Sequence, residues 1–433
     1  MISLNWVNDY VDLKGVDLKD LALKITKAGV NVESVHSNHI ENLVIGKILE
    51  CENHPDSDHL HVCKVDVKDE TLTIVCGASN VHKGQKVIVA KPGAILPGNF
   101  EIKKSKIRNV ESCGMICALF ELGLEEKNEE TYAKGIAELP EDAPVGEDPI
   151  AYLGLDDTLY ELDLNPNRFM DCTNHLGFAY EVAAVLGKKV KKPETTYPEE
   201  NTSMNDQFSL TVETENCPYY STKIVTGVTI KESPEFIKRR LEAAGMRSIN
   251  NVVDISNYIM LEYGQPLHFF DKDTLGDHIT VRMAKENEKM ITLDGKEREL
   301  TDQDILITDG ENPVCIAGVM GGLESEVTEK TKNILIESAI FDPYHVRYTS
   351  LRLDLRSEAS LRMEKGLNVD YTKEALDRAC YLLCKYAGGK VLKDTIVHDQ
   401  VLRKEKIVTV SLKEINALLG MTLKEEDVVR SLE

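Results

Sequence analysis

Short strand-like runs crowd the stretch from about residue 42 to residue 120, and this crowding constrains the fold more than any other feature. The runs include LVIGKILE, LHVCKVDV, LTIVCGA and KVIVAKPGA, and Pro, Gly, Asn and Asp separate them. Short strands at such close spacing are typical of a small barrel, because closure of the sheet removes its exposed edges. The sequence therefore predicts a β-barrel over residues 40–149.

Helical patterns flank the predicted barrel on both sides. Residues 17–29 predict a helix that Asp17 caps and Gly29 ends. A second helix is expected over residues 173–186, before the stop signal of Gly187. The apolar face of the first helix consists of Leu18, Leu21, Ala22, Ile25 and Ala28.

The rest of the chain predicts an α/β region and the start of another domain. Residues 188–206 carry many charges and two prolines, which is typical of a linker. Over residues 207–398, strand-like runs such as TKIVTGVTI alternate with helical runs such as PEFIKRRLEAAG, as in an α/β or α+β domain. From Val401, a strand-like KIVTVS and two helical patterns are too short to bury a core. We therefore expect a multidomain α+β chain that is cut inside a further small α/β domain.

Composition excludes several classes of protein. The formal net charge of −22 argues against a general polyanion binder. No apolar run approaches the length of about 18 residues that spans a membrane. The start MISLNWVNDY lacks the features of a secretory signal, and ten cysteines at irregular positions are typical of a reducing compartment. Together these features predict a cytoplasmic protein without a membrane partner.

Basic residues are nonetheless concentrated in one part of the predicted barrel. Residues 81–110 contain seven Lys or Arg and one acid, whereas residues 121–163 contain fourteen acids and two lysines. A local basic strip can follow the phosphates of an RNA backbone, and a solvated lysine-rich surface is the alternative. The candidate RNA-binding residues are Lys83, Lys86, Lys91, Lys103, Lys104, Lys106 and Arg108.

Four potential metal ligands, His54, His59, His61 and Cys63, lie close together in the sequence. Structural zinc sites usually draw paired ligands from tight turns, with a spacing that these four residues do not have. Alternating residues of this kind are more typical of buried or half-buried strand positions. We therefore predict no metal ligand in this chain.

Three motifs of the barrel segment, NHPDSDHL, VCGASN and SCGMIC, resemble those of the tRNA-binding OB-fold module. Further motifs extend the resemblance along the chain. They are MISLNWVNDY, ELDLNPNRFMDCTNHLG, RSINNVVDISNYIMLEYGQPLHFFD, GVMGG, ESAIFDP and LRSEASLRMEKGLN. In order and spacing these motifs are similar to those of the β subunit of bacterial phenylalanine–tRNA ligase, of which the chain resembles the N-terminal half.

The resemblance implies a domain organisation. Residues 1–39 are expected to pair with residues 150–200 as one discontinuous α/β domain. The OB-fold module, residues 40–149, is inserted into it. Residues 207–398 are expected to form an editing domain of the B3/B4 type, and residues 401–433 the truncated start of a B5-type domain.

The resemblance also implies partners and cofactors. The expected partners are tRNA(Phe) and an α subunit within an α₂β₂ tetramer, and ATP-dependent phenylalanylation resides in that α subunit. ATP and Mg²⁺ are expected for the complete two-subunit enzyme, with no cofactor and no magnesium ligand in this fragment. Residues 165–168 serve either a subunit contact or a capped loop before the next helix.

An enzyme that activates phenylalanine must reject tyrosine, which differs by one hydroxyl. An apolar pocket rejects an added hydroxyl only about 100-fold, whereas a site that hydrogen-bonds the hydroxyl discriminates by about 10⁴ to 10⁵. Glu337 follows the β-like run 334–336 and resembles the family's acceptor for the tyrosine hydroxyl; a salt-bridged strand-end glutamate is the alternative. His268 resembles the editing-site histidine; a core histidine beside Phe269 and Phe270 is the alternative.

The resemblance places further residues around the editing pocket. Arg247 corresponds to a basic residue near the 3′ end of the tRNA, and Pro266 lies in a turn whose carbonyls can orient water. The expected reaction is hydrolysis of the ester between tyrosine and tRNA, with His268 and Glu337 as catalytic residues and without a Ser-His-Asp triad. The remaining pocket positions are Gly318, Gly321, Ser357 and Ala359.

Two functions follow from this sequence. In the first, the chain is a ligase subunit that binds tRNA and edits mischarged Tyr-tRNA(Phe). In the second, it is a non-catalytic scaffold that binds tRNA and holds the α subunit. Deacylation of tyrosyl-tRNA distinguishes the two.

Overall fold

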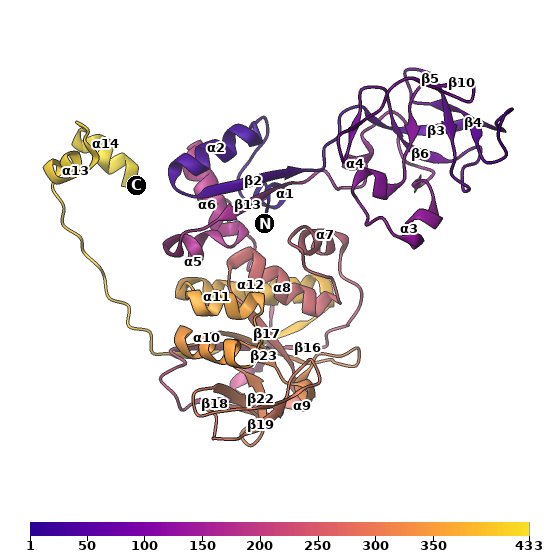
Figure 1. Ribbon diagram of the computed structural model, residues 1–433. Coiled ribbons are helices and arrows are strands. Elements are labelled where there is room, and N and C mark those ends of the chain that lie inside the picture. Colours follow the sequence, from indigo (N-terminus) through magenta and orange to yellow (C-terminus); the bar gives the residue numbers. More distant parts are fainter. Residues whose placement is uncertain (433) are drawn as a thin grey trace.

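The structure is a computed structural model that describes residues 1–432, and it has a mixed α+β fold (Figure 1). The first unit is a three-stranded antiparallel sheet in the order β1-β13-β2. Its strands come from distant parts of the chain, because the barrel segment is inserted between β2 and β13. Its elements are β1 (Ile2–Ser3), α1 (Leu4–Val7), α2 (Leu18–Ala28), β2 (Asn31–Ser37), β13 (Thr158–Asp163), α5 (Phe169–Cys172) and α6 (His175–Leu186).

Helix α2 forms as predicted because its start and stop signals are local. The Asp17 carboxylate accepts hydrogen bonds from the first backbone N–H groups of the helix. Gly29 ends the helix with a φ of 112°, a left-handed conformation that favours glycine. The predicted second helix is α6, which Gly187 ends in the same way. The buried residues of α2 are Leu21, Ala22 and Ile25.

The second unit is a barrel-like sheet in the order β11-β6-β3-β4-β5, with β12 paired to β6. The sheet nearly closes, because the Cys113 N–H donates a hydrogen bond to the Thr73 carbonyl of β5 at 2.8 Å. Its elements are β3 (Leu43–Asn53), β4 (His61–Asp66), β5 (Thr71–Cys76), β6 (Lys86–Ala90), β7 (Ile95–Leu96), β8 (Phe100–Glu101), β9 (Ser105–Ile107), β10 (Val110–Ser112), β11 (Met115–Ile116), α3 (Glu129–Lys134), β12 (Glu138–Leu139) and α4 (Pro149–Tyr152).

The third unit contains a six-stranded sheet in the order β14-β25-β16-β24-β17, with β26 paired to β16. Helices α8 and α12 cover one face of this main sheet. The elements are β14 (Glu199–Ser203), β16 (Tyr219–Thr226), α7 (Glu235–Ala243), α8 (Asn251–Tyr263), β17 (Leu267–Asp271), α9 (Lys272–Leu275), β24 (Ile334–Ile340), α12 (Val369–Ala387), β25 (Lys390–Lys393) and β26 (Ile396–Asp399).

A second sheet, in the order β15-β18-β21-β22-β23, packs on the other face of the main sheet. The two sheets share one apolar core, to which Tyr220, Phe270 and Leu335 contribute from the main sheet. The elements are β15 (Ser209–Val212), β18 (His278–Met283), β19 (Lys289–Ile291), β20 (Glu297–Glu299), β21 (Ile305–Thr308), β22 (Pro313–Ile316), β23 (Met320–Gly321), α10 (Pro343–Arg352) and α11 (Glu358–Lys365).

The predicted linker, residues 188–206, is wrong in part, because β14 lies within it. This strand pairs in parallel with β25, which is almost 200 residues away in the sequence. The Lys223 ammonium, only 2% exposed, bonds to the Glu199 carboxylate of β14. A buried ammonium needs a partner, so the charged stretch serves the sheet rather than a flexible connection.

The last segment also differs from its prediction. No strand forms over the strand-like KIVTVS, and within the described residues the segment contains only α13 (Leu412–Leu419) and α14 (Glu425–Leu432). A β-branched run needs a partner strand to form a sheet, and none pairs with it. Figure 1 shows the extended stretch that leads to the two helices. The proposal that they begin a further domain stays a prediction.

The first unit packs directly on the helix layer of the third unit. One apolar cluster joins Trp6 and Phe178 of the first unit to Ile255 of α8. A polar link lies beside it, where the Tyr10 hydroxyl donates to the Glu262 carboxylate, which also pairs with Arg378 at 2.9 Å. Among residues 1–432, no helix has the length and apolar character needed to cross a membrane.

Candidate functional site

Three polar side chains form a row across the main sheet. In the antiparallel register, Thr222 of β16 pairs with Glu337 of β24, and Glu337 pairs with His268 of β17. Directly opposed residues point to the same face of a sheet, with Cβ atoms roughly 5 Å apart. A hydroxyl, a carboxyl and an imidazole therefore lie side by side. We call Thr222, Glu337 and His268 the polar row.

Strand alternation decides which face the polar row occupies. Ile334 and Ile336 contribute to the apolar core of the helix layer, whereas Leu335 and Ala339 contribute to the core between the two sheets. Successive strand residues point to opposite faces, so Glu337 points towards the second sheet. The unbroken apolar run before Glu337 has no alternation, so its sequence did not indicate this face.

Glu337 is a buried carboxyl without a cationic partner among the described residues. It lies within β24 rather than at the strand end and is 4% exposed. The Tyr220 hydroxyl donates a hydrogen bond to its Oε2 at 3.4 Å. Burial raises the pKa of Glu337 to about 8, so the group is mostly protonated at pH 7. A protonated carboxyl both donates and accepts hydrogen bonds, as a phenol does.

Two thiols complete the surroundings of Glu337. Burial raises the pKa of the Cys217 thiol and that of the Cys315 thiol well above the usual value for cysteine, and the charge of Glu337 is the second cause. Both thiols are therefore protonated at neutral pH and are not nucleophiles. The carboxyl is the chemically distinctive group of this cluster.

His268 differs from a core histidine. Its half-buried ring packs edge-on against Phe270, with ring centroids 4.4 Å apart. Burial alone lowers its pKa to about 4, and its ring has no hydrogen bond within the described residues, so it is neutral with free nitrogens at pH 7. The buried His175 shows the core pattern, because the Ser3 N–H and the Leu261 carbonyl occupy its two ring nitrogens at 3.1 and 2.9 Å.

Gly321 of β23 lies against the His268 ring. A Cβ at this position would be 2.5 Å from His268 Cε1, which is shorter than van der Waals contact. Only glycine therefore allows the second sheet to approach the ring so closely. Gly318, with a φ of 69°, lies instead beside Val346 of α10 and Met363 of α11. Of the two predicted pocket glycines, Gly321 is the one next to the polar row.

Pro266 is buried in the turn between α8 and β17. The Gln265 side-chain amide donates to the Pro266 carbonyl at 3.1 Å and to the Ala339 carbonyl at 3.0 Å. The Thr372 hydroxyl donates to the same amide at 3.4 Å. The Pro266 carbonyl thus already accepts one hydrogen bond from the protein, and Gln265 fixes β17 against β24.

The other predicted pocket residues make no hydrogen bond or ion pair with the polar row within residues 1–432. Ser357 caps α11, because its hydroxyl accepts a hydrogen bond from the Ser360 N–H at 3.1 Å. Ala359 is half-buried in the first turn of that helix. Arg247 is exposed in the loop between α7 and α8, in the helix layer behind the main sheet. Their roles in a pocket stay predictions.

Thr222 is the candidate that sequence reasoning missed. Its Oγ1 is buried and has no hydrogen-bond partner in the described structure. A buried hydroxyl without a partner costs free energy, so such a group is a candidate for binding a ligand. The run TKIVTGVTI resembles any buried strand, and no local signal singles out this threonine.

In the barrel unit, four of the seven predicted RNA-binding residues lie on one segment, residues 103–108. Lys103 forms an ion pair with Glu101 at 2.7 Å. Arg108 donates to the Asp56 carbonyl at 2.8 Å and so ties this segment to the turn after β3. We call residues 103–108 the basic segment. Its exposed cationic residues are Lys103, Lys104, Lys106 and Arg108.

The other three lysines lie around β6 and not on the basic segment. Lys83 is exposed in the turn before this strand. The Lys86 ammonium bonds to the Ala143 carbonyl, so part of its function is structural. Lys91 is half-buried just after the strand. RNA binding by these seven residues stays a prediction.

Of the candidate metal ligands His54, His59, His61 and Cys63, His54 has a structural function. The Asp56 N–H donates to His54 Nδ1 at 3.0 Å, and His54 Nε2 contacts the Ile107 carbonyl at 3.1 Å. Both ring nitrogens are thus occupied by the backbone. His54 stabilises the turn beside the basic segment.

One grouping of metal-type ligands occurs among the described residues, formed by Asp171, Cys172 and Glu181. The Arg168 guanidinium lies within it, 2.8 Å from Asp171 and also bonded to Glu181. A guanidinium already neutralises these carboxylates, so the grouping is an ion-pair cluster. The predicted contact of residues 165–168 with another subunit stays a prediction.

Comparison with known proteins places both candidate regions in described families. Residues 43–148 match the family model of a putative tRNA binding domain, and residues 216–388 match that of the B3/4 domain. The first match contains the basic segment, and the second contains the polar row.

The chain is also similar over its whole length to curated proteins. It is 50% identical over 439 residues to the phenylalanine–tRNA ligase beta subunit of Geobacillus kaustophilus, covering 100% of this chain and 54% of that protein. It is 48% identical over 435 residues to the beta subunit of Staphylococcus aureus, covering 99% and 54%. The chain thus spans about half the length of the curated relatives it matches. An N-terminal fragment of the phenylalanyl-tRNA synthetase beta subunit from Pyrococcus horikoshii is 17% identical with a TM-score of 0.31, covering 63% of this chain and 75% of that one.

Proposed function

We propose, from the premise that the chain belongs to the phenylalanine–tRNA ligase beta-subunit family, that it binds tRNA(Phe) and hydrolyses mischarged Tyr-tRNA(Phe). The observation that carries the editing proposal is the surrounding of Glu337. A phenolic hydroxyl, that of Tyr220, already bonds to this buried carboxyl, which has no cationic partner among the described residues. The phenol of a tyrosyl group is the same chemical group.

Recognition of tyrosine would follow from the state of Glu337. In the present conformation the carboxyl is 4% exposed, so the substrate phenol must take the place of the Tyr220 hydroxyl. A phenylalanyl group in that place would leave the carboxyl without a partner, and the Thr222 hydroxyl, which has none in the described structure, would gain none. Unpaired buried polar groups are costly, which favours the tyrosyl ester over the phenylalanyl ester.

Hydrolysis requires a water molecule next to the ester carbonyl. The free ring nitrogens of His268 can hold this water, because the half-buried ring lies at the solvent side of the polar row. With a pKa of about 4 the imidazole is a weak base, so its role is to orient the water rather than to remove its proton fully. The water oxygen attacks the carbonyl carbon, the bond to the ribose oxygen breaks, and that oxygen takes up a proton.

The whole enzyme would divide its functions between two chains. We propose an α subunit as the partner, within an α₂β₂ tetramer, and ATP-dependent phenylalanylation in that subunit. ATP and Mg²⁺ belong to this complete enzyme, and no step assigned to the present chain uses them. The location expected for it is the cytoplasm.

The decisive experiment compares two esters. The purified 433-residue chain is incubated with tRNA(Phe) charged with tyrosine or with phenylalanine, and release of the amino acid is followed. Release of tyrosine is expected to be at least about 100-fold faster. His268→Ala is expected to slow the release of tyrosine about 100-fold, because a misplaced water costs about that factor in rate. His39→Ala changes an exposed histidine and is the control that leaves the rate unchanged. Binding of both tRNAs without deacylation would support the scaffold function instead.

A further inference from the structure

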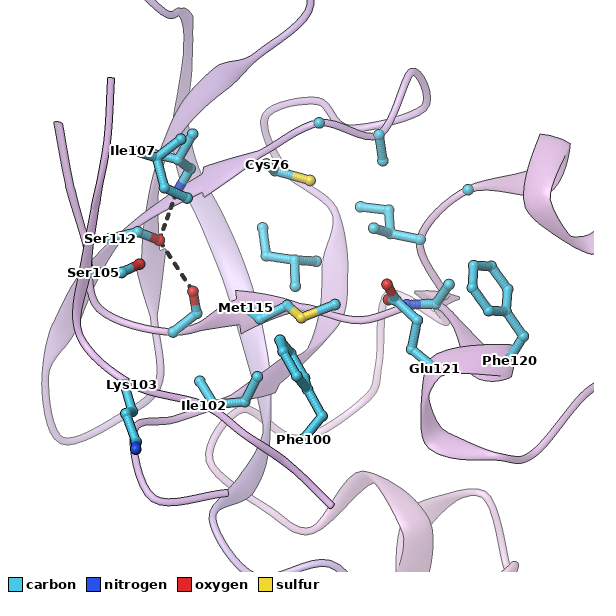
Figure 2. A pocket seen from close by; sticks show the side chains of 18 of the residues that line it. Cys76, Phe100, Ile102, Lys103, Ser105, Ile107, Ser112, Met115, Phe120 and Glu121 are labelled. Carbon is cyan, nitrogen blue, oxygen red and sulfur yellow. Dashed lines mark hydrogen bonds between the residues drawn. The ribbon is translucent and has the colours of Figure 1, made fainter. Parts of the chain in front are cut away.

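A cavity lies in the barrel unit, and no residue of the polar row lines it. It has a volume of about 750 Å³ and is lined by residues of the neighbouring strands β5 and β11, among them Cys76 and Met115 (Figure 2). Ile102 and Met115 form part of its apolar wall. The Ser112 hydroxyl bridges the seam, because it accepts from the Val75 N–H and donates to the Gly114 carbonyl, both at 3.1 Å. This volume is within the range of small-ligand sites and is large enough for a nucleoside.

Three aromatic rings, those of Phe100, Phe120 and Tyr132, line this cavity. Phe100 is 58% exposed and Tyr132 is 68% exposed, although both are large aromatic residues. Phe120 lies beside Tyr132, with ring centroids 6.2 Å apart. Sites for single-stranded nucleic acid use such rings to stack bases, because every base has a π face. Three aromatic rings around one cavity favour a planar ligand.

A carboxyl group lies among these rings. Figure 2 shows Glu121 between Phe100 and Phe120. Its Oε2 accepts a hydrogen bond from the Ala118 N–H at 2.7 Å, and its Oε1 has no hydrogen bond within the described residues. A carboxylate oxygen accepts hydrogen bonds, so it selects a ligand edge that carries N–H donors.

The charged residues near the cavity indicate how an RNA strand would be oriented in it. The basic segment supplies Lys103, Ser105 and Ile107 to the lining. Glu101 also lines the cavity and pairs with Lys103 at 2.7 Å, so the exposed Lys104 and Lys106 are the residues of this segment that attract phosphates. Between the lining residues Phe120 and Tyr132 the chain carries an acidic stretch, which repels phosphates. An RNA strand would therefore place its backbone on the basic segment and its base edge towards Glu121. The acidic residues are Glu125, Glu126, Glu129 and Glu130.

We infer that this cavity holds one unstacked nucleobase of a bound RNA and prefers a base with an exocyclic amino group, such as cytosine over uracil. The amino group at position 4 of cytosine donates to Glu121, whereas uracil presents an oxygen there and is repelled. The inference rests on the proposed tRNA-binding function and deepens it. It adds a base-specific contact to a basic surface whose other proposed contacts are with phosphates.

The test uses the 433-residue chain and labelled oligonucleotides of ten cytidines or ten uridines, with binding followed by fluorescence anisotropy. The wild-type chain is expected to bind the cytidine strand about 10-fold more tightly. Glu121→Gln keeps an acceptor for the Ala118 N–H and is expected to reduce this preference to about 1-fold. Phe100→Ala and Tyr132→Ala are expected to weaken both strands about 5- to 100-fold. Tyr344→Ala, with the same exposure of 68%, is the control without effect.

Salt dependence separates base contacts from phosphate contacts. The double variant Lys104→Ala, Lys106→Ala is expected to lower the slope of log affinity against log salt by about 1.4, whereas Phe100→Ala leaves the slope unchanged. Normal binding by the aromatic variants, or a cytidine preference that survives Glu121→Gln, overturns the inference. If tRNA(Phe) still binds in that case, the proposed tRNA function stands. Failure of the wild-type chain to bind tRNA or either oligonucleotide overturns both.

Discussion

Glu262 on α8 and Glu337 on β24 are both buried glutamates, but they have opposite surroundings. Glu262 is 0% exposed and accepts hydrogen bonds from the Arg378 guanidinium at 2.9 and 3.1 Å and from the Tyr10 hydroxyl. Glu337 is 4% exposed, and within residues 1–432 its side chain bonds only to the Tyr220 hydroxyl, at 3.4 Å. Burial is nearly the same, so the partners account for the difference.

The two sites show how the partners of a buried carboxyl indicate its role. The pairing of Glu262 with Arg378 and Tyr10 joins the first unit to the helix layer, so it serves the structure. Glu337 joins no units and gains no opposite charge, yet it occupies the core between two sheets. A buried carboxyl that is costly to the fold and has a perturbed pKa is a candidate for function.

The largest expected effect is on the paired site. Glu262→Ala leaves the Arg378 charge buried without its partner, which is expected to lower the free energy of unfolding by about 3 to 5 kcal/mol. Urea unfolding measures this change. Glu311→Ala, at an exposed position, is the control. A loss below about 1 kcal/mol for Glu262→Ala would contradict the structural role of the pair.

The stability of the folded chain is expected to depend on pH through Glu337. The pKa of Glu337 is about 8 in the folded chain, whereas the ordinary value for glutamate is 4.5. Between these two pH values the folded chain therefore binds more protons than the unfolded chain. The stability that Glu337 contributes is therefore present below pH 4.5 and is lost as the pH rises through 8. Glu337→Gln is expected to remove this loss, which is on the order of 3 kcal/mol, in urea unfolding at pH 5, 7 and 9. Parallel curves for the two proteins would exclude the raised pKa.

The contribution of His268 to stability is expected to change with pH in the opposite direction. Its pKa falls from 6.5 to about 4 on folding, so the unfolded chain binds the proton first. Stability from this group is present above pH 6.5 and is lost as the pH falls through 4. Because the ring is half-buried, the expected loss is about 1 to 2 kcal/mol. His268→Gln should flatten the difference between pH 7 and pH 4.5, and an unchanged difference would contradict the burial of the ring.

The smallest expected effect is on the free energy of unfolding when either of two adjacent hydroxyls on β16 is removed. Thr222→Val removes a buried hydroxyl that has no partner, so the free energy of unfolding is expected to stay the same or to rise by up to about 1 kcal/mol. Ser221→Ala removes a hydroxyl that donates to the Ser338 carbonyl at 3.0 Å and is expected to cost about 1 kcal/mol. Thermal unfolding of both variants decides. A larger loss for Thr222→Val would show that its hydroxyl is already paired.

Local signals predicted the parts of the fold that depend on neighbouring residues. Asp17 and Gly29 mark both ends of α2 within the sequence, and the structure has those ends. The barrel-like sheet was likewise expected from the short runs between residues 40 and 149. Strand β14 was missed, because its parallel pairing with β25 depends on residues far away in the chain.

The candidate site was predictable residue by residue but not as an arrangement. The motifs pointed to His268 and Glu337, yet their pairing joins strands that lie 69 positions apart, and no local pattern encodes this register. Thr222 had no signal at all, since it resembles any strand threonine. The pocket role of Ser357 stays a prediction, whereas its position before EAS is a readable helix cap, and the structure has that cap.

The most direct measurement is the ratio of the hydrolysis rates of tyrosyl-tRNA(Phe) and phenylalanyl-tRNA(Phe) in the wild-type chain and in Glu337→Ala, with the fold of both checked by urea unfolding. The account predicts that the ratio is at least about 100 in the wild-type chain and falls close to 1 in the folded variant. A folded Glu337→Ala variant that keeps the wild-type ratio would contradict the claim that this carboxyl recognises the tyrosine hydroxyl.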